Sequence, residues 1–245
     1  MFSRVEAFVR DVGNVESEQG LAEALAEIGK DMGLRYFALT HHTDVKRTSR
    51  AIRLHNYPEG WADWFDEQQL GPVDPVHRAS HLTNVGFAWS SLPRMIKLTP
   101  RDEQILAAAR SEGIGDGFTV PAHVPGEVHG SCSFAAESGI ALSPEQLPLL
   151  QLIGAFAFDA ARRISRVREP GLPAARLTER QLECLVWAAR GKSDWEIATI
   201  IGVSHETVIR HLKQARERYG VPKRTLLTVH ALFDGNIAFS DIIKD

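Results

Sequence analysis

The segment from Asp194 to Lys213 constrains the fold more than any other part of this sequence. It reads DWEIATIIGVSHETVIRHLK, in which two short helical patterns are separated by a glycine. Gly202 is suited to end the first helix, and Ser204 is suited to cap the second by accepting a hydrogen bond from the Thr207 amide. A short helix, a tight turn and a capped second helix are typical of the helix-turn-helix motif.

The second helix of this motif has an apolar face and a polar face. Val208, Leu212 and Ala215 recur at helical spacing and are expected to point inward. A helix-turn-helix places its second helix in the major groove of DNA. The residues that we expect to contact DNA, including two basic residues that flank the motif, are Lys192, His205, Glu206, Thr207, Ile209, Arg210, Lys213 and Arg224.

Among these residues, Arg210 is the strongest candidate for reading a base. Its guanidinium can bond guanine O6 and N7 together, which discriminates by about 1–3 kcal/mol. Thr207 and Lys213 are better suited to phosphate or to a thymine methyl group. The competing interpretation is a helical hairpin with a solvated charged face, but the cap, the turn and the apolar spacing all agree with the DNA-binding motif.

Composition and charge fit two folded domains with the DNA-binding part at the C-terminal end. The chain has 245 residues, of which 44% are hydrophobic, so it can bury two cores. Residues 176–245 hold 11 Lys and Arg against 9 Asp and Glu, whereas residues 1–175 hold 17 against 22. The net charges are therefore +2 and −5, and the cations are concentrated where DNA would be bound.

The cysteines and the N-terminus bear on the compartment. Two cysteines are too few for a disulfide framework, so a reducing cytoplasm is expected. The sequence has no basic-then-apolar leader pattern and no apolar run of membrane-spanning length. These features predict a soluble cytoplasmic protein that does not use a membrane as a partner.

A domain boundary is expected at residues 166–176, RVREPGLPAAR, where two prolines, a glycine and several charges replace any apolar period. This segment predicts a linker between a domain at 1–165 and a DNA-binding domain at 177–245. In the second domain a helix begins after the Thr178 cap and ends at Gly191, and a further helix spans Leu226 to Phe233. Together with the two helices of the motif, these make a domain of four short helices.

The first domain mixes helical and strand-like stretches. Helical periods are found at 1–12, 20–32, 60–69, 100–112 and 143–164, and strand-like composition at 36–40, 48–54, 118–124 and 131–136. The helix predicted at 143–164 has more apolar surface than one face of a domain needs. We therefore expect this helix to contribute to a homodimer interface.

A second informative group of residues lies between Tyr57 and Trp89. Trp61 and Phe65 are one helical turn apart, so their rings are expected to face the same side. Tyr57 and Trp61 each combine an apolar body with one polar hydrogen, and Asp74 offers acceptor oxygens. Converging on a cavity, they would suit a small apolar ligand that carries an amide and a carbonyl. From the residues alone, aromatic core packing and an Asp74 helix cap explain the pattern as well.

These two blocks together, 57–89 and 177–224, resemble the LuxR-type quorum-sensing regulators, which bind N-acyl-homoserine lactones. The resemblance implies that Trp61 donates to the lactone carbonyl and that Asp74 accepts the amide hydrogen. It further implies that Tyr57 and a strand hydroxyl hold the acyl carbonyl and that Gly117 is a turn glycine. The ligand-contacting residues that it implies are Tyr57, Trp61, Phe65, Asp74, Trp89, and Ser131 or Ser133.

Two positions depart from that family's pattern. Phe65 stands where a tyrosine is usual, so a polar contact with the acyl part is in doubt. Gln181 stands where a glutamate is usual, which leaves open a charge contact between helices or with RNA polymerase. The elements and the resemblance together predict an α+β protein. Its N-terminal part would be an α/β/α sandwich with an antiparallel sheet, and its C-terminal part an all-α four-helix helix-turn-helix domain.

The function that follows is a ligand-responsive transcriptional regulator in quorum sensing. It would bind an N-acyl-homoserine lactone, use no cofactor and no metal, and bind an inverted-repeat DNA operator as a homodimer. The alternatives are an orphan regulator that senses another small molecule, and a regulator that binds DNA when empty and is released by ligand. A response regulator is disfavoured because residues 1–165 lack an acidic cluster at strand ends.

Catalysis is also disfavoured. The candidate catalytic or metal-binding side chains show neither a nucleophile elbow nor the helical spacing of a His-Glu-x-x-His site. These side chains are His41, His42, His123, His129 and Cys132.

Overall fold

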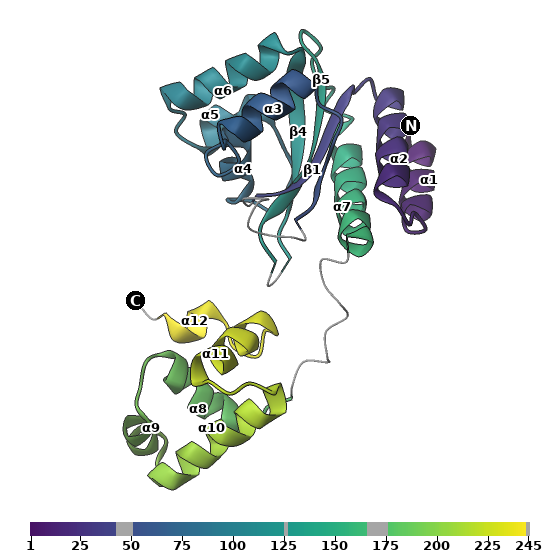
Figure 1. Cartoon of the computed structure of the whole chain (residues 1–245). Helices are drawn as coiled ribbons and strands as arrows, with labels where there is room; N and C mark the ends of the chain where they lie inside the picture. Colours follow the sequence, from purple (N-terminus) through teal and green to yellow (C-terminus); the bar gives the residue numbers. More distant parts are fainter. Residues whose placement is uncertain (43–50, 125–126, 166–175, 244–245) are drawn as a thin grey trace. The chain divides into compact units, whose positions relative to one another are not determined.

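The computed structural model describes residues 1–42, 51–124, 127–165 and 176–243. The chain divides into two compact units, Met1–Glu169 and Pro170–Asp245 (Figure 1). The linker predicted at 166–176 lies outside the described residues except for Arg176, so its boundaries stay a prediction. Among the described residues, no helix combines the length and the apolar character that crossing a membrane requires.

The first unit is built on an antiparallel sheet with the strand order β2-β1-β5-β4-β3. In the register of this sheet, Ala38 of β1 lies opposite His55 of β2 and Ser133 of β5. The long strands β1 and β5 are buried at almost every residue, as expected when both faces of a sheet are covered. The strands are β1 (Tyr36–His41), β2 (Arg53–His55), β3 (Phe87–Ala88), β4 (Ile114–Ala122) and β5 (Gly130–Glu137).

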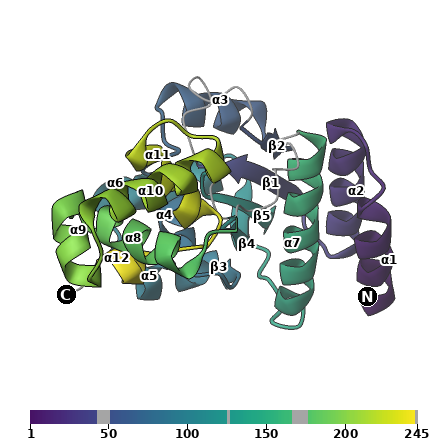
Figure 2. The same ribbon diagram turned by 90° about the horizontal axis from the view of Figure 1, so that it is seen from below.

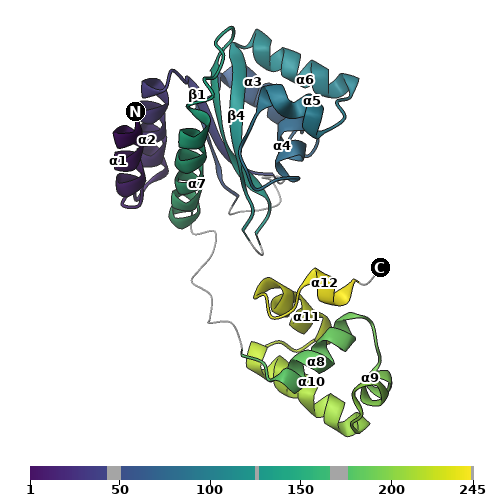
Figure 3. The same ribbon diagram turned by 180° about the vertical axis from the view of Figure 1, so that it is seen from behind.

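Helices cover the two faces of the sheet. One face carries α1 (Phe2–Val12), α2 (Glu18–Asp31) and α7 (Leu147–Ile164), which lie side by side in Figures 1 and 2. Leu21, Leu25, Leu150 and Ile153 of α2 and α7 are almost fully buried in this core. The other face carries four helices, grouped on the far side of the sheet from α7 (Figure 3). They are α3 (Glu59–Glu67), α4 (Pro75–Ser80), α5 (Leu92–Met95) and α6 (Pro100–Ser111), with a 3-10 turn at Trp89–Ser91. The predicted α/β/α sandwich is therefore confirmed.

Several predicted boundaries were wrong. Strand β4 begins at Ile114 rather than at Phe118. Gly115 and Gly117 allow β4 and β5 to approach closely where the register between them shifts, so the strand starts earlier than predicted. Gly117 is a strand residue rather than a turn glycine. A Cβ there would lie 2.6 Å from the Trp89 ring. Helix α7 begins at Leu147, four residues later than predicted. Strand β2 ends one residue beyond the predicted 48–54, and residues 48–50 lie outside the described residues.

The second unit has the predicted motif. Gly202 ends α9 with φ 70°, in the left-handed region, and the Ser204 side chain accepts a hydrogen bond from the Thr207 amide at the start of α10. Val208, Leu212 and Ala215 are buried, as predicted. The helices are α8 (Glu179–Ala189), α9 (Asp194–Ile201), α10 (His205–Tyr219), α11 (Arg224–Phe233) and α12 (Phe239–Ile242). The one-turn α12 was not predicted, because four residues are too few to show a helical period.

Candidate ligand cavity and DNA-binding face

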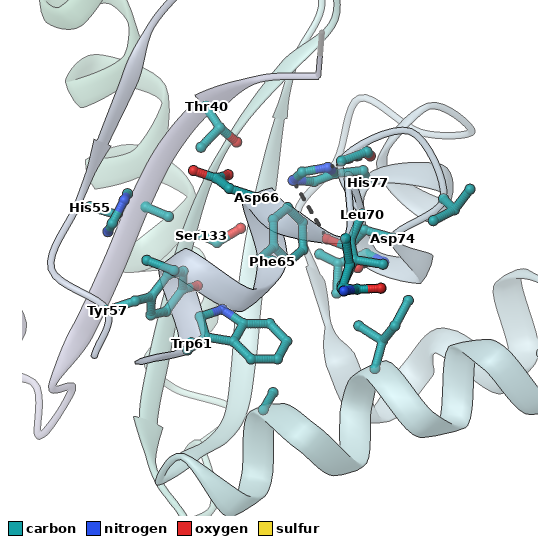
Figure 4. Close-up of a pocket in the computed structure, with 18 of the residues that line it drawn as sticks. Thr40, His55, Tyr57, Trp61, Phe65, Asp66, Leu70, Asp74, His77 and Ser133 are labelled. Carbon is teal, nitrogen blue, oxygen red and sulfur yellow. Dashed lines mark hydrogen bonds and ion pairs between the residues drawn. The ribbon is translucent and has the colours of Figure 1, made fainter. Parts of the chain in front are cut away.

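A cavity of about 840 Å³ lies between the sheet and helices α3, α4 and α6. Its wall includes Trp61 and Phe65 of α3, whose rings lie 5.7 Å apart and both line the cavity, as the one-turn spacing predicts. Figure 4 shows Tyr57, Trp61, Phe65, Asp74 and Ser133 around the same space. Six of the seven predicted ligand residues therefore line this cavity, Trp89 among them, and Ser131 does not.

Asp74 is the acidic group deepest in this site, with 8% of its surface exposed. Its Oδ1 accepts a hydrogen bond from the Val76 amide at 3.0 Å, so Asp74 is the N-cap of α4. Its Oδ2 lies 3.6 Å from Nε2 of His77. Burial raises the pKa of Asp74 above its ordinary value, because desolvation penalises the charged form. The helix-cap and cavity-lining interpretations of this residue therefore both hold.

Ser133 belongs to a chain of hydrogen bonds that starts at an indole. Nε1 of Trp89 donates to the Thr119 hydroxyl at 2.8 Å, and the Thr119 and Ser133 hydroxyls are 2.8 Å apart. Thr119 is fully buried, so its own hydrogen is satisfied only if it donates to Ser133. Ser133 then keeps its hydroxyl hydrogen for the cavity, while Trp89 offers the cavity only a ring surface.

Two further polar groups of the wall, on Tyr57 and Trp61, can donate hydrogen bonds to a ligand. The Tyr57 hydroxyl and the Trp61 indole N–H have no protein partner among the described residues. Burial raises the pKa of Tyr57, so its hydroxyl stays protonated and can donate. With Ser133 the cavity presents three donors, and Asp74 supplies an acceptor. A ligand with two carbonyl groups and one amide N–H matches this set.

Ser131 is placed differently from Ser133. Both residues lie on β5, but the Ser131 hydroxyl bonds Nε2 of His42 at 2.9 Å and is not part of the cavity wall. Of the two serines that the resemblance left open, the structure places only Ser133 at the cavity.

The sequence patterns did not single out several polar residues that line the cavity. The buried Nδ1 of His55 has no partner among the described residues. His77 is three residues after Asp74 on α4, and that helical spacing is the signal that could have found it. The polar lining residues that were missed include Thr40, Arg53, His55, Asp66 and His77.

A group of histidines extends from the cavity wall toward the surface. His77 stacks on His42 with ring centroids 3.9 Å apart, and Nδ1 of His42 lies 2.8 Å from Nε2 of His81. The rings of His81 and His129 are 4.5 Å apart, and those of His123 and His129 are 4.6 Å apart. Desolvation is the largest cause of a lowered pKa at His42, and it also lowers the pKa of His81 and His129.

These histidines do not form a metal site in the part of the chain that the structure describes. Cys132 has no exposed surface, and burial raises the pKa of its thiol, which disfavours the nucleophilic thiolate. Neither observation supports the catalytic alternative.

The outer face of α10 carries the predicted DNA-contacting residues. Arg210, Lys213 and Ile209 are exposed, with Ile209 at 42%. The His205 ring stacks on that of Trp195 from α9, with centroids 4.2 Å apart and planes inclined by 6°. Trp195 is 68% exposed. The start of α10 thus presents a stacked pair of rings beside these three exposed side chains. Glu206 is also exposed on this face, and hydrogen bonds at the helix start lower its pKa.

Three other predicted contacts are engaged within the protein. Arg224 donates to Asp194 at 2.7 Å and to the Lys192 carbonyl at 2.6 Å, which ties α11 to the start of α9. The Lys192 ammonium pairs with Glu196 at 3.0 Å. The Thr207 hydroxyl lies 3.0 Å from that of Ser204. Their contacts with DNA stay predictions.

Gln181, the second departure from the family pattern, is only 2% exposed. Its side chain accepts from the Thr178 amide and donates to Gln214 of α10 at 3.3 Å. Gln181 therefore makes a neutral contact between α8 and α10, at a position where the family usually has a charged glutamate, and its side chain does not face outward.

Comparisons with known protein families match both units. Residues 17–161 match the autoinducer binding domain family, and residues 175–231 match the family of bacterial regulatory proteins of the luxR type. The transcriptional activator protein VanR of Vibrio anguillarum is 29% identical over 238 residues, which cover 96% of this chain and 98% of VanR. The quorum sensing-dependent transcriptional regulator RpaR of Rhodopseudomonas palustris is 31% identical over 184 residues, covering 75% of this chain and 74% of RpaR.

A solved structure agrees with the fold. The crystal structure of Escherichia coli SdiA covers 99% of this chain and 99% of its own, with a TM-score of 0.62 and 23% sequence identity. The N-terminal unit is thus an autoinducer-binding domain, and the C-terminal unit is a DNA-binding helix-turn-helix domain. The chain therefore belongs to the LuxR family of transcriptional regulators of quorum sensing, and it is not an enzyme.

Proposed function

We propose that the ligand of the N-terminal unit is an N-acyl-homoserine lactone. Trp61 Nε1 donates to the lactone carbonyl, and Asp74 accepts the ligand amide hydrogen. The hydroxyls of Tyr57 and Ser133 donate to the acyl carbonyl. Phe65 and Trp89 pack against the ligand through ring surfaces.

The observation that carries this proposal is the match between the polar groups of the cavity and those of the ligand. Three donors and one buried carboxylate face a space of about 840 Å³. A buried polar group without a partner costs roughly 1–3 kcal/mol. A lactone with two carbonyl groups and one amide N–H satisfies these groups together.

Ligand binding stabilises the unit by mass action. At a free concentration 100 times its dissociation constant, a ligand adds about 2.7 kcal/mol to the free energy of unfolding. For a domain of marginal stability, this increment decides whether the chain accumulates folded.

The DNA-bound form is a homodimer in this proposal. Leu152 and Phe156 are four residues apart on α7 and are 40% and 45% exposed, so they form an apolar strip on that helix. Leu226 and Val229 of α11 are exposed in the same way, at 40% and 55%. A two-fold dimer presents two copies of α10 to successive major grooves, so the operator is an inverted repeat.

The experiment is quantitative DNA binding with and without an acyl-homoserine lactone, on an inverted repeat and on its half-site. We expect tight binding only to the repeat and only with lactone. Arg210→Ala should lose about 1–3 kcal/mol of preference between cognate and altered operators, because it removes the bidentate contact with guanine. Lys213→Ala is the matched control, since a phosphate contact weakens binding to all sequences alike.

The outcomes separate the alternatives. Tight binding without ligand that lactone abolishes would identify a regulator that ligand releases from DNA. Indifference of DNA binding to every lactone would favour an orphan regulator of another small molecule. Unchanged sequence preference in Arg210→Ala would contradict the assignment of base reading to α10.

A further inference from the structure

We propose that the acyl group of the ligand carries a hydrogen-bonding substituent, such as a hydroxyl, at its far end, and that the Thr40 hydroxyl binds it. This inference rests on the proposed lactone ligand and names its chemical class more closely. It is argued from a row of polar residues on the sheet, Arg53, Thr40 and Ser131, which make no contact with the lactone ring or the amide in the proposed complex.

The register of the sheet defines two rows of residues that point to the cavity side. In the first row His55, Ala38 and Ser133 lie opposite one another on β2, β1 and β5. This row includes Ser133, which holds the acyl carbonyl in the proposed complex. The second row lies two residues farther along β1, which is roughly 7 Å at the rise of a strand. Its members are Arg53, Thr40 and Ser131.

The second row is polar on all three strands. Arg53 is paired with Asp66 of α3 at the cavity wall, and Ser131 bonds His42. Thr40 lies between them, lines the cavity, and has no hydrogen bond from its hydroxyl to any described residue. An alkyl chain that ended here would cover polar groups without satisfying them.

The opposite wall at this end is polar as well. In Figure 4, Thr40, Asp66 and His77 lie toward one end of the cavity, and Tyr57 and Trp61 lie toward the other. Nδ1 of His77 lies 2.9 Å from the Gly71 carbonyl, so this nitrogen donates to that oxygen, and Nε2 lies 3.6 Å from Oδ2 of Asp74. The far end of the cavity thus offers the tip of an acyl group polar neighbours and the Thr40 hydroxyl, which has no partner among the described residues.

The energetic consequence is selectivity between two ligands that differ only at the tip. A neutral hydrogen bond is worth about 0.5–1.5 kcal/mol net. We therefore expect a hydroxylated acyl group to bind roughly 3- to 10-fold more tightly than its alkyl counterpart. Sites that bond a hydroxyl discriminate against ligands that lack it, because their own polar groups are left unpaired.

The test compares N-hexanoyl-homoserine lactone with its counterpart that carries a terminal hydroxyl, by calorimetric titration of the full chain. The wild type should prefer the hydroxylated lactone. Thr40→Val, which keeps the β-branched shape suited to a strand, should reduce or reverse this preference. Thr40→Ser, which keeps the hydroxyl, should retain it. Thr225→Val, at an exposed position of α11, is the control and should behave as the wild type does.

The failures are distinguishable. If neither lactone binds, the proposed lactone ligand is wrong and this inference falls with it. If both lactones bind and the wild type shows no preference, or prefers the alkyl form, the lactone proposal stands and the polar tip is wrong. A preference that survives Thr40→Val, with thermal unfolding showing a folded variant, overturns the role of Thr40.

Discussion

At the scale of single residues, Asp74 joins local structure to ligand recognition. One carboxylate oxygen caps α4, and the other lies near His77 at the cavity. Burial raises the pKa of Asp74, because desolvation penalises its charged form, and a ligand amide N–H that bonds the carboxylate would offset this cost. The same side chain therefore has a structural and a recognition task, which different substitutions can separate.

The first prediction separates these two tasks with Asp74→Asn. Asparagine caps a helix about as well as aspartate, so the ligand-free unit should keep its thermal stability. If the amide oxygen accepts from the Val76 amide, the NH₂ group faces the ligand amide, and two donors oppose each other. Lactone affinity should then fall about 10- to 100-fold, the value of a hydrogen bond to a charged group.

The control is Asp74→Ala, which loses the cap as well and should lower the free energy of unfolding by about 1 kcal/mol. Thermal unfolding and lactone titration on both variants measure the two effects. Wild-type affinity in Asp74→Asn would show that the carboxylate does not receive the ligand.

Single residues could be predicted where a pattern within the nearby sequence marks them. Trp61 and Phe65 were found because they are one turn apart on a helix, and Ser204 because a cap has a local sequence signature. Thr40 and Arg53 were missed because they meet only through the strand register, and the pairing of β1 with β2 is a tertiary contact. Ser131 and Ser133 could not be told apart, since only three-dimensional neighbours direct one to His42 and the other to the cavity.

At the scale of elements, the helix-turn-helix was predictable and the sheet only in part. Helices α9 and α10 are specified by apolar spacing, a glycine and a cap that all lie within twenty residues. Strand β4 was misplaced at its start because Gly115 and Gly117 have low strand propensity. They are tolerated because the Glu137 carbonyl and the Trp89 ring approach so closely that a side chain would not fit.

The clustered histidines lie on or next to β1, α4, β4 and β5, and the lowered pKa of one of them, His42, predicts that the stability of the unit depends on pH. His42 faces His41, His77, His81 and His129, and its pKa is lowered. As pH falls below about 6.5, the unfolded chain binds a proton that the folded chain does not. The unit should therefore lose up to roughly 1.4 kcal/mol of unfolding free energy per pH unit through this residue.

Chemical denaturation between neutral and mildly acid pH measures this loss. His42→Gln should reduce the pH dependence, because it removes one of the histidines whose pKa is lowered in the folded chain. His230→Gln, at an exposed position of α11, is the matched control and should leave the slope unchanged. Equal slopes in the wild type and His42→Gln would contradict the account.

At the scale of the whole molecule, the two units have independent cores and complementary chemistry. The N-terminal unit holds a cavity whose largely apolar wall carries several polar groups, and the C-terminal unit exposes cations on a recognition helix. Their order along the chain could be predicted from charge and motif. The volume of the cavity and its polar far end could not, because both depend on how α3, α4 and α6 pack over the sheet.

In the proposed complex an acyl-homoserine lactone fills this cavity, and calorimetric titration of the purified full chain with such a lactone measures its binding. We expect saturable binding of one lactone per chain, accompanied by a higher thermal unfolding temperature and weakened by Trp61→Phe, which removes the indole N–H donor and keeps a smaller aromatic ring. Absence of saturable binding to any acyl-homoserine lactone, or equal affinity in Trp61→Phe, would contradict the proposed complex.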